Sequence, residues 1–414
     1  MCGIFGFIGN NNAGKIVLEG LKRLEYRGYD SWGIAVAENG KIFVQKNTGK
    51  IGQITQTDFS YSHAGIGHTR WATTGAVTKI NAHPHYSSDK SFALAQNGIV
   101  ENYEELKEKL IKKGYKFLSE TDTEVIVRLI EKELVKTKNI RLAVSRAFKQ
   151  LKGRNTIILI TKDQEILAVR NGSPLVVGFG KDQIYLSSDT LSFAPYTKKV
   201  LVVDNGQMVI AGKSVSLIDN KTDRKIEVNI ENIEIKAEEA SKEKYPHYML
   251  KEIHEAPFVL GQLIKQSKKT YEDIARAIKH AKNVYTIGSG GAGVAAAQIG
   301  YYLRSIGKIK AVSLIGADAE EYEDLFTSSD LIIVISQSGE TADVLEVIER
   351  AKKKGVKTTQ LKGDVGHKKA ISRGGKSVLA NLFVQDPGEN RSFSRNKDGS
   401  MLSERSKREK KRKA

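Results

Sequence analysis

The sequence has one cysteine, only six prolines in 414 residues, and no apolar run near the roughly 20 residues that a membrane span needs. A single cysteine cannot form an internal disulfide, which fits a reducing compartment. The N-terminus lacks the basic stretch and apolar stretch of a signal peptide. We therefore expect a globular, cytoplasmic protein with no membrane partner.

The sequence has little excess charge of either sign until its last part. Residues 352–414 hold 19 Lys and Arg against 6 Asp and Glu, so they carry +13 of the net +18. The first 351 residues carry only +5. A terminal basic run is typical of a solvated, disordered tail, although it could also bind polyanions. Nucleic-acid binding is therefore an expectation for the tail alone.

Two patterns of secondary structure divide the chain. Up to about residue 235, short β-like runs such as GIFGFIG, SWGIAVA and NTIILITKD alternate with turn residues, and two helical stretches interrupt them. From about residue 270, strands alternate with helices, which predicts a parallel α/β unit. We expect an α+β domain over 1–235, a linker over 236–269, an incomplete α/β domain over 270–375 and a basic tail over 376–414.

The single cysteine lies directly behind the initiator methionine. Removal of Met1, which is usual before a small residue, would place the thiol of Cys2 beside a free α-amine. That amine has an ordinary pKa of roughly 7.7–8.0 and can take the thiol proton. The simpler interpretation of Cys2 is a small hydrophobic residue in a β-strand.

Three further stretches offer the other groups of an amide-cleaving site. GHTRWATTG contains Arg70, whose guanidinium is suited to binding a carboxylate. LAQNGIVEN contains Asn97 and Gly98, which offer an amide side chain and a backbone N–H to an oxyanion. SETDTEV places Asp122 at the start of a helix, where its carboxylate could bind an ammonium group. Each has a simpler explanation. Arg70 could form a surface pair, Asn97-Gly98 a hairpin turn, and Asp122 a helix cap.

Together, MCGIFG, LEYRGYDSWGIAV, HTRWATTG, NAHPH, QNGIVENYEEL and SETDTEV resemble the class II glutamine amidotransferases. The resemblance covers residues 2–235 and implies the αββα sandwich of N-terminal nucleophile enzymes, with Cys2 attacking the glutamine side-chain amide. The residues that the resemblance assigns to the oxyanion are Asn97 and Gly98. Those assigned to glutamine are Arg70, Trp71, Thr73, Asp122, Arg27 and Tyr29. Many members carry His where this sequence has Thr74.

The second half contains a motif with two interpretations. VYTIGSGGAG holds Gly288, Gly290 and Gly293 in the spacing of a dinucleotide-binding loop, and Asp318 follows 25 residues after Gly293. A nicotinamide cofactor is therefore an alternative. DLIIVISQSGETADVLEVI favours a sugar phosphate instead, because its hydroxyls and N–H groups meet at a helix start; the simpler interpretation is a Ser-rich N-cap.

SQSGET resembles the signature of sugar isomerase (SIS) domains, which have a three-layer, flavodoxin-like α/β fold, and YPHYMLKEIHEAP resembles the linker to such domains. Residues 1 to about 360 resemble the glutamine–fructose-6-phosphate amidotransferase family. The resemblance implies glucosamine 6-phosphate and glutamate as products, fructose 6-phosphate and glutamine as substrates, a homodimer, and no metal or other cofactor. The residues that it assigns to the sugar phosphate are Ser289, Ser336, Gln337, Ser338 and Thr341.

Two departures from this family affect the functional prediction. Gly290 replaces a serine in the first SIS loop, and after about Thr359 the family pattern is lost although members continue into a second SIS domain. We expect a frameshifted or truncated ending that proteases clip beyond about residue 360, and a second domain of marginal stability. The alternatives are a chain that acts only as a glutaminase and a non-catalytic sugar-phosphate binding protein.

Overall fold

The computed structural model describes residues 2–52, 54–233, 244–246, 248–264, 268–336 and 341–362. The chain divides into two compact units, Met1–Glu243 and Lys244–Ala414. Helix α5 (Tyr248–Ile264) lies within the range expected to be a linker. Among the described helices, none combines the length and the apolar character that a membrane crossing requires.

The first unit contains an eight-stranded sheet in which every neighbouring pair is antiparallel. The strand that follows Cys2 lies inside this sheet, with a hydrogen-bonded neighbour on each side. In the order of the sheet the strands are β15 (Glu231–Asn232), β11 (Lys199–Val202), β9 (Val176–Gly180), β10 (Gln183–Ser187), β1 (Gly3–Gly9), β4 (Ala64–Arg70), β2 (Ser31–Glu38) and β3 (Lys41–Thr48).

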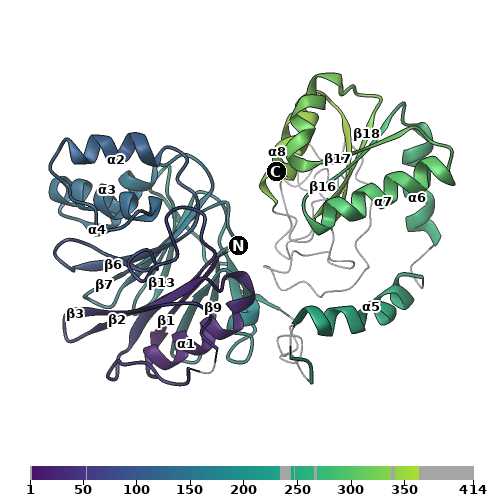
Figure 1. Cartoon of the computed structure of the whole chain (residues 1–414). Helices are drawn as coiled ribbons and strands as arrows, with labels where there is room; N and C mark the ends of the chain where they lie inside the picture. Colours follow the sequence, from purple (N-terminus) through teal and green to yellow (C-terminus); the bar gives the residue numbers. More distant parts are fainter. Residues whose placement is uncertain are drawn as a thin grey trace, which may run out of the picture. The chain divides into compact units, whose positions relative to one another are not determined.

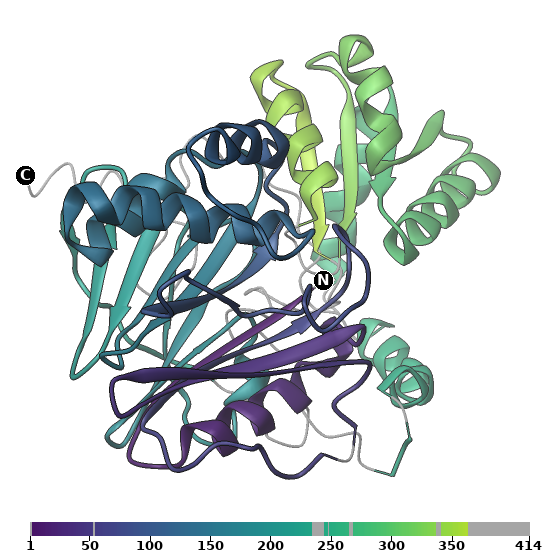
Figure 2. The same cartoon turned by 60° about the vertical axis from the view of Figure 1, so that its left-hand side comes forward.

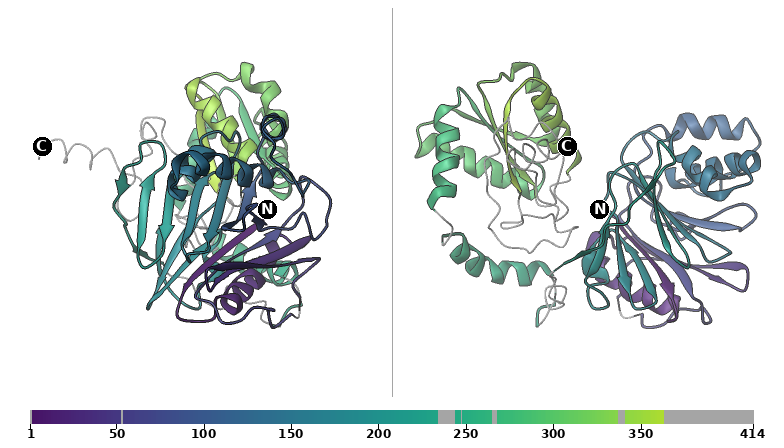
Figure 3. Two further views of the ribbon diagram at one scale, coloured as in Figure 1. Left: turned by 90° about the vertical axis from the view of Figure 1, so that its left-hand side faces the viewer. Right: turned by 180° about the vertical axis from the view of Figure 1, so that it is seen from behind.

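A seven-stranded antiparallel sheet forms the second β layer of this unit. Figures 2 and 3 show the two sheets as adjacent layers. In sheet order its strands are β14 (Lys225–Ile226), β13 (Val215–Asp219), β12 (Gln207–Ala211), β8 (Ile166–Asn171), β7 (Asn155–Thr161), β6 (Phe92–Gly98) and β5 (His85–Tyr86).

Helices cover the outer faces of both sheets (Figure 1). The helix on the eight-stranded sheet is α1 (Ala13–Arg23), and those on the seven-stranded sheet are α2 (Tyr103–Ile111), α3 (Asp122–Thr137) and α4 (Ile140–Phe148). Alternation along β1 explains the layering: Ile4 enters the core between the sheets, while Phe5 and Phe7 pack under α1. The αββα sandwich predicted from the sequence is confirmed.

The second unit is built on a four-stranded parallel sheet. In sheet order its strands are β17 (Ala311–Ile315), β16 (Val284–Gly288), β18 (Leu331–Ser336) and β19 (Lys357–Lys362). The helices α6 (Lys268–His280) and α7 (Gly291–Ser305) cover one face, and α8 (Ala342–Lys353) covers the other. The predicted three-layer α/β arrangement is therefore confirmed.

One expected helix differs in type. The strand–helix alternation of the second half predicts an α-helix at AEEYEDLF, but this segment lies in a 3-10 helix, η4 (Gly316–Leu325). At 3-10 spacing Glu320 and Glu323 lie on the same side of the helix, where both pair with Arg350 of α8 at 3.4 and 2.9 Å, which favours this conformation. The basic tail and the proposed frameshift lie outside the described residues, because the last of these is Lys362.

Candidate active site

The thiol of Cys2 lies between the two backbone groups of Trp71. The Trp71 N–H donates to Sγ at 3.3 Å, and the thiol donates to the Trp71 carbonyl oxygen at 3.5 Å. Cys2 is partly exposed and directly precedes β1, so the first strand of the protein carries it. The side chain is therefore held in place by the backbone just after β4 and remains open to a small molecule.

Burial raises the pKa of the Cys2 thiol, against the opposing effects of the Trp71 N–H, the N-terminal charge, Arg70 and Arg27. At neutral pH the thiol is then almost entirely protonated and needs a base before it can attack. A free α-amine on Cys2 would be that base at the shortest possible distance. The geometry thus agrees with the chemistry expected for an N-terminal nucleophile.

The carbonyl group of Cys2 is held by two side chains from distant parts of the chain. Asn97 Nδ2 donates to this oxygen at 3.1 Å, and Arg27 Nε donates to it at 3.0 Å. Arg27 is in turn 3.7 Å from the buried carboxylate of Asp189. Asp189 also accepts a 2.5 Å hydrogen bond from Tyr26. The sequence analysis did not predict Asp189. A buried arginine at position 27 requires a buried carboxylate nearby to neutralise its charge, and Asp189 supplies it.

Asn97 and Gly98 end β6 without forming a hairpin turn. Asn97 stays paired with Thr156 and Gly98 with Asn155 on β7, so the simpler explanation of this dipeptide is wrong. Gly98 has a φ of +126°, and a Cβ atom built on it would lie 1.9 Å from the Arg154 carbonyl oxygen. Only glycine fits at this position. Gly98 directly follows Asn97, the residue whose side chain reaches the Cys2 carbonyl oxygen.

Gly98→Ala is expected to destabilise the first unit strongly, because the new methyl must displace the backbone at Arg154. We expect a loss of about 3 kcal/mol or more in the free energy of unfolding. The matched control is Gly114→Ala, whose φ is +85° but whose Cβ would meet nothing within 4 Å. Urea denaturation measures both variants, and equal losses would contradict a steric requirement at Gly98.

Arg70 ends β4 and is only 3% exposed, so it does not form the surface pair considered as its simpler role. Its guanidinium donates to a loop that follows it directly: Nη1 to Ala76 O at 3.3 Å, and Nη2 to Gly75 O at 3.2 Å and to Thr74 O. The Thr74 contact uses the backbone carbonyl oxygen of that residue.

Asp122 is the first residue of α3, and the preceding Thr121 occupies the N-cap position. Asp122 Oδ2 accepts the Val100 N–H at 2.8 Å, which ties the start of α3 to the segment after Gly98. The side chain is buried, and burial raises its pKa. Asp122 and Arg70 nevertheless interact electrostatically, so an acid and a base of opposite charge face the same region.

The remaining predicted glutamine residues lie at the rim. The rings of Tyr29 and Trp71 contact each other edge to face at 5.4 Å between centroids, and Lys50 Nζ lies 5.6 Å from the centre of the Tyr29 ring. Both aromatic side chains are more than 40% exposed. Thr73 is exposed and makes no hydrogen bond with any residue that the structure describes, so its role toward glutamine stays a prediction.

Three buried histidines behind Arg70 also escaped sequence reasoning. The rings of His68 and His83 are 4.4 Å apart, and those of His83 and His85 are 5.0 Å apart. Burial lowers the pKa of His68 to about 3 and lowers the pKa values of His83 and His85 well below their ordinary range. Within the described residues, no three His, Cys, Asp or Glu side chains are arranged to hold a metal ion.

The candidate sugar-phosphate residues lie at the carboxyl ends of two neighbouring parallel strands. Ser289 follows β16 and Ser336 ends β18, and the pairing of Ile287 with Val334 brings these ends together. The strand order changes direction at this pair, which is where ligands bind in open α/β sheets. Ser336 Oγ is 2.9 Å from the Oγ1 of Thr341, the N-cap of α8.

Ser289 has a buried Oγ with no hydrogen-bond partner among the described residues. A buried hydroxyl without a partner is costly, so this group requires an acceptor or donor other than the residues that the structure describes. Gln337 and Ser338, also predicted to bind the sugar phosphate, lie outside the described residues.

Comparison with known proteins also indicates two domains in this chain. Residues 68–194 match the family model of a glutamine amidotransferase domain, and residues 277–362 match that of a SIS domain. A glutamine phosphoribosylpyrophosphate amidotransferase from B. subtilis has a similar fold, with a TM-score of 0.50 at 20% identity over 87% of this chain and 81% of that one. The chain carries a glutamine amidotransferase domain of the N-terminal nucleophile fold, followed by a SIS domain.

Two named relatives indicate which glutamine amidotransferases this chain is similar to. Two proteins named glutamine–fructose-6-phosphate aminotransferase (isomerizing), from Methanococcus maripaludis and Aquifex aeolicus, are each 39% identical to this chain over 88% of its length. The matches cover 63% and 62% of those proteins, so the chain spans less than two thirds of their length. They confirm the resemblance to the glutamine–fructose-6-phosphate amidotransferase family that the motifs predicted.

Proposed function

We propose that this chain hydrolyses glutamine at Cys2 and delivers the ammonia to fructose 6-phosphate, giving glutamate and glucosamine 6-phosphate. The observation that carries the proposal is the placement of Cys2 against Asn97, Arg27 and Trp71, three residues that the sequence assigned to one site from separate motifs. The same resemblance supports a homodimer in the cytoplasm.

The proposed first step transfers an acyl group to sulfur. The α-amine of trimmed Cys2 takes the thiol proton, and the thiolate attacks the side-chain carbonyl carbon of glutamine. The oxyanion that forms accepts hydrogen bonds from Asn97 Nδ2 and the Gly98 N–H. The protonated α-amine then gives its proton to the leaving nitrogen, ammonia departs, and water hydrolyses the thioester to glutamate and free thiol.

Arg70 and Asp122 would hold the two ends of the amino acid. Arg70 is a planar donor that suits the α-carboxylate, and Asp122 is a carboxylate that suits the α-ammonium. Burial of the two charged side chains costs free energy. A ligand with a carboxylate and an ammonium group would offset this cost, because it pairs Arg70 with a negative charge and Asp122 with a positive charge. Tyr29 and Trp71 would shield the bound side chain from water.

The SIS domain would hold the phosphate of the sugar between the ends of β16 and β18. The orphaned Ser289 hydroxyl, the Ser336–Thr341 pair and the N-terminus of α8 all offer neutral donors there. No basic side chain is required, because a helix start and hydroxyls suffice for a phosphate monoester. The same observations support a sugar phosphate over the nicotinamide alternative, since the SIS match covers the glycine-rich loop.

A glutaminase without sugar chemistry is the second candidate, because the groups placed around Cys2 all lie within the first unit. Ammonia and glucosamine 6-phosphate should be assayed side by side, with glutamine alone and with added fructose 6-phosphate. We expect both products. Ammonia alone would support the glutaminase, and sugar-phosphate binding with neither product would support a non-catalytic binding protein.

A further inference from the structure

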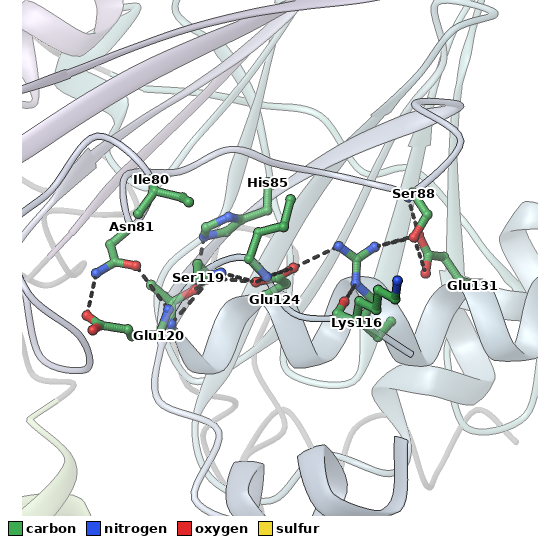
Figure 4. Close-up of polar contacts among 12 residues, drawn as sticks. Ile80, Asn81, His85, Ser88, Lys116, Ser119, Glu120, Glu124 and Glu131 are labelled. Carbon is green, nitrogen blue, oxygen red and sulfur yellow. Dashed lines mark hydrogen bonds and ion pairs between the residues drawn. The ribbon is translucent and has the colours of Figure 1, made fainter. Parts of the chain in front are cut away.

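The loop that follows Arg70 is attached to the segment before α3 by a closed set of hydrogen bonds. Asn81 is 1% exposed, and its amide nitrogen donates to Glu120 Oε2 at 2.8 Å and to Ala76 O at 3.0 Å. Its amide oxygen accepts the Glu120 N–H at 3.0 Å. Figure 4 shows this reciprocal pair of Asn81 and Glu120, which we call the staple.

The staple holds the same peptide units that receive Arg70. Glu120 Oε2 accepts the Ala76 N–H at 3.0 Å, while the Ala76 carbonyl accepts from both Asn81 and Arg70 Nη1. Gly75 has a φ of +78°, and its Cα lies so close to the staple that a Cβ would be 3.0 Å from Glu120 and 3.1 Å from Asn81. The guanidinium of Arg70 is thus positioned by a loop whose own shape depends on Asn81 and Glu120.

The other end of the staple is fixed to the helix that carries Asp122. Glu120 lies two residues before Asp122, and the residues around it are held in turn: Thr121 Oγ1 is 2.9 Å from His85 Nε2, and Ser119 N–H donates to Glu124 at 2.6 Å. Glu124 also forms a buried ion pair with Arg128 at 2.7 Å. The start of α3 therefore has a rigid base, and Glu120 projects from it to the Arg70 loop.

We propose that the Asn81–Glu120 staple sets the separation between Arg70 and Asp122 and thereby the specificity of the site for an α-amino acid. Neither residue needs to touch the ligand, so both are positioning residues. The inference rests on the proposed function, because it takes Arg70 and Asp122 as the groups that bind the carboxylate and the ammonium. It adds the element that holds these two charges at a fixed distance.

Binding of both ends of an amino acid requires both charges in place at once. A loop without the staple would let Arg70 move relative to α3, so that binding energy is spent on ordering the loop. The nucleophile directly precedes β1, a strand that is hydrogen-bonded on both sides within its sheet. Loss of the staple should therefore weaken glutamine binding and leave the intrinsic reactivity of Cys2 in place.

Three variants and one control test this in the full chain. Asn81→Ala and Glu120→Ala remove the staple, while Glu120→Gln keeps an acceptor oxygen that can receive both the Ala76 N–H and the Asn81 amide. Glu131→Gln is the control, since Glu131 lies further along α3 and contacts Ser88 and Arg128 instead. We expect the two alanine variants to raise KM for glutamine about 10- to 100-fold with kcat changed less than about threefold.

Two readouts besides activity separate the outcomes. Binding of L-glutamate by calorimetry should weaken by the same factor as KM rises, and alkylation of Cys2 by iodoacetamide, which has neither an ammonium nor a carboxylate, should keep its rate. Glu120→Gln and Glu131→Gln should stay within about threefold of the unmodified protein in all three measurements.

The proposed function and this inference fail in different ways. If the unmodified chain does not hydrolyse glutamine, the proposed function is wrong. If it does, and the alanine variants keep their KM, the staple does not position Arg70. Equal losses in kcat, glutamate binding and iodoacetamide alkylation would show that the staple only supports the fold, which would also overturn the inference.

Discussion

Cys2→Ala is expected to lower glutamine hydrolysis by about 10³-fold or more, because it removes the only thiol in the chain and with it the nucleophile of the proposed reaction. Arg70 and Asp122 remain in this variant, so L-glutamate should bind as well as before. Ammonia release measures the first effect and calorimetry the second.

The interpretation of that result depends on two further observations. Cys2→Ser should fall nearly as far as Cys2→Ala, since a hydroxyl beside an amine is a much weaker nucleophile than a thiol. Mass spectrometry of the purified protein should show that Met1 has been removed. Hydrolysis that persists in Cys2→Ala, or a retained methionine in active protein, would contradict the N-terminal nucleophile.

Acid should destabilise the first unit strongly, because three buried histidines must stay neutral for it to fold. In the folded state the pKa of His68 is about 3, whereas the unfolded chain takes up this proton near the ordinary value of 6.5. The unfolded state therefore binds more protons between these values, and stability falls as pH drops from about 6.5 towards 3. His68 alone accounts for about 3 kcal/mol at pH 4.5.

Urea denaturation at pH 7.5, 5.5 and 4.5 measures this dependence. His68→Gln does not titrate, so its stability should fall less steeply with acid than that of the unmodified protein. The exposed His63 is the matched control, and His63→Gln should keep the full slope. A slope unchanged in His68→Gln would contradict the assignment of acid sensitivity to this histidine cluster.

The sequence predicted those helices and strands whose hydrophobic periodicity lies within one continuous segment. The alternation of GIFGFIG is reproduced in β1, and strand–helix alternation predicted the parallel unit from β16 to α8. Motif order also predicted that Cys2 and Asn97 would meet, and they do at the Cys2 carbonyl oxygen. The catalytic and binding roles assigned to these residues stay predictions.

Contacts that join distant segments were not predictable in the same way. Asp189 holds Arg27 across 162 positions, and Asn81 holds Glu120 across 39, and no local periodicity marks such partners. The burial of His68 was equally hidden, because a histidine in a strand is as compatible with a surface as with a core.

The strand that carries Cys2 is hydrogen-bonded on both sides, to β10 and to β4. Chain ends usually fray, whereas displacing this one would break two ladders of a sheet. The sulfur atom is therefore held in one position. Any movement that opens the site to a ligand must occur in the loops around Cys2. Substitutions that tune turnover through motion should accordingly cluster in the Tyr29 and Trp71 segments and spare Gly3–Gly9.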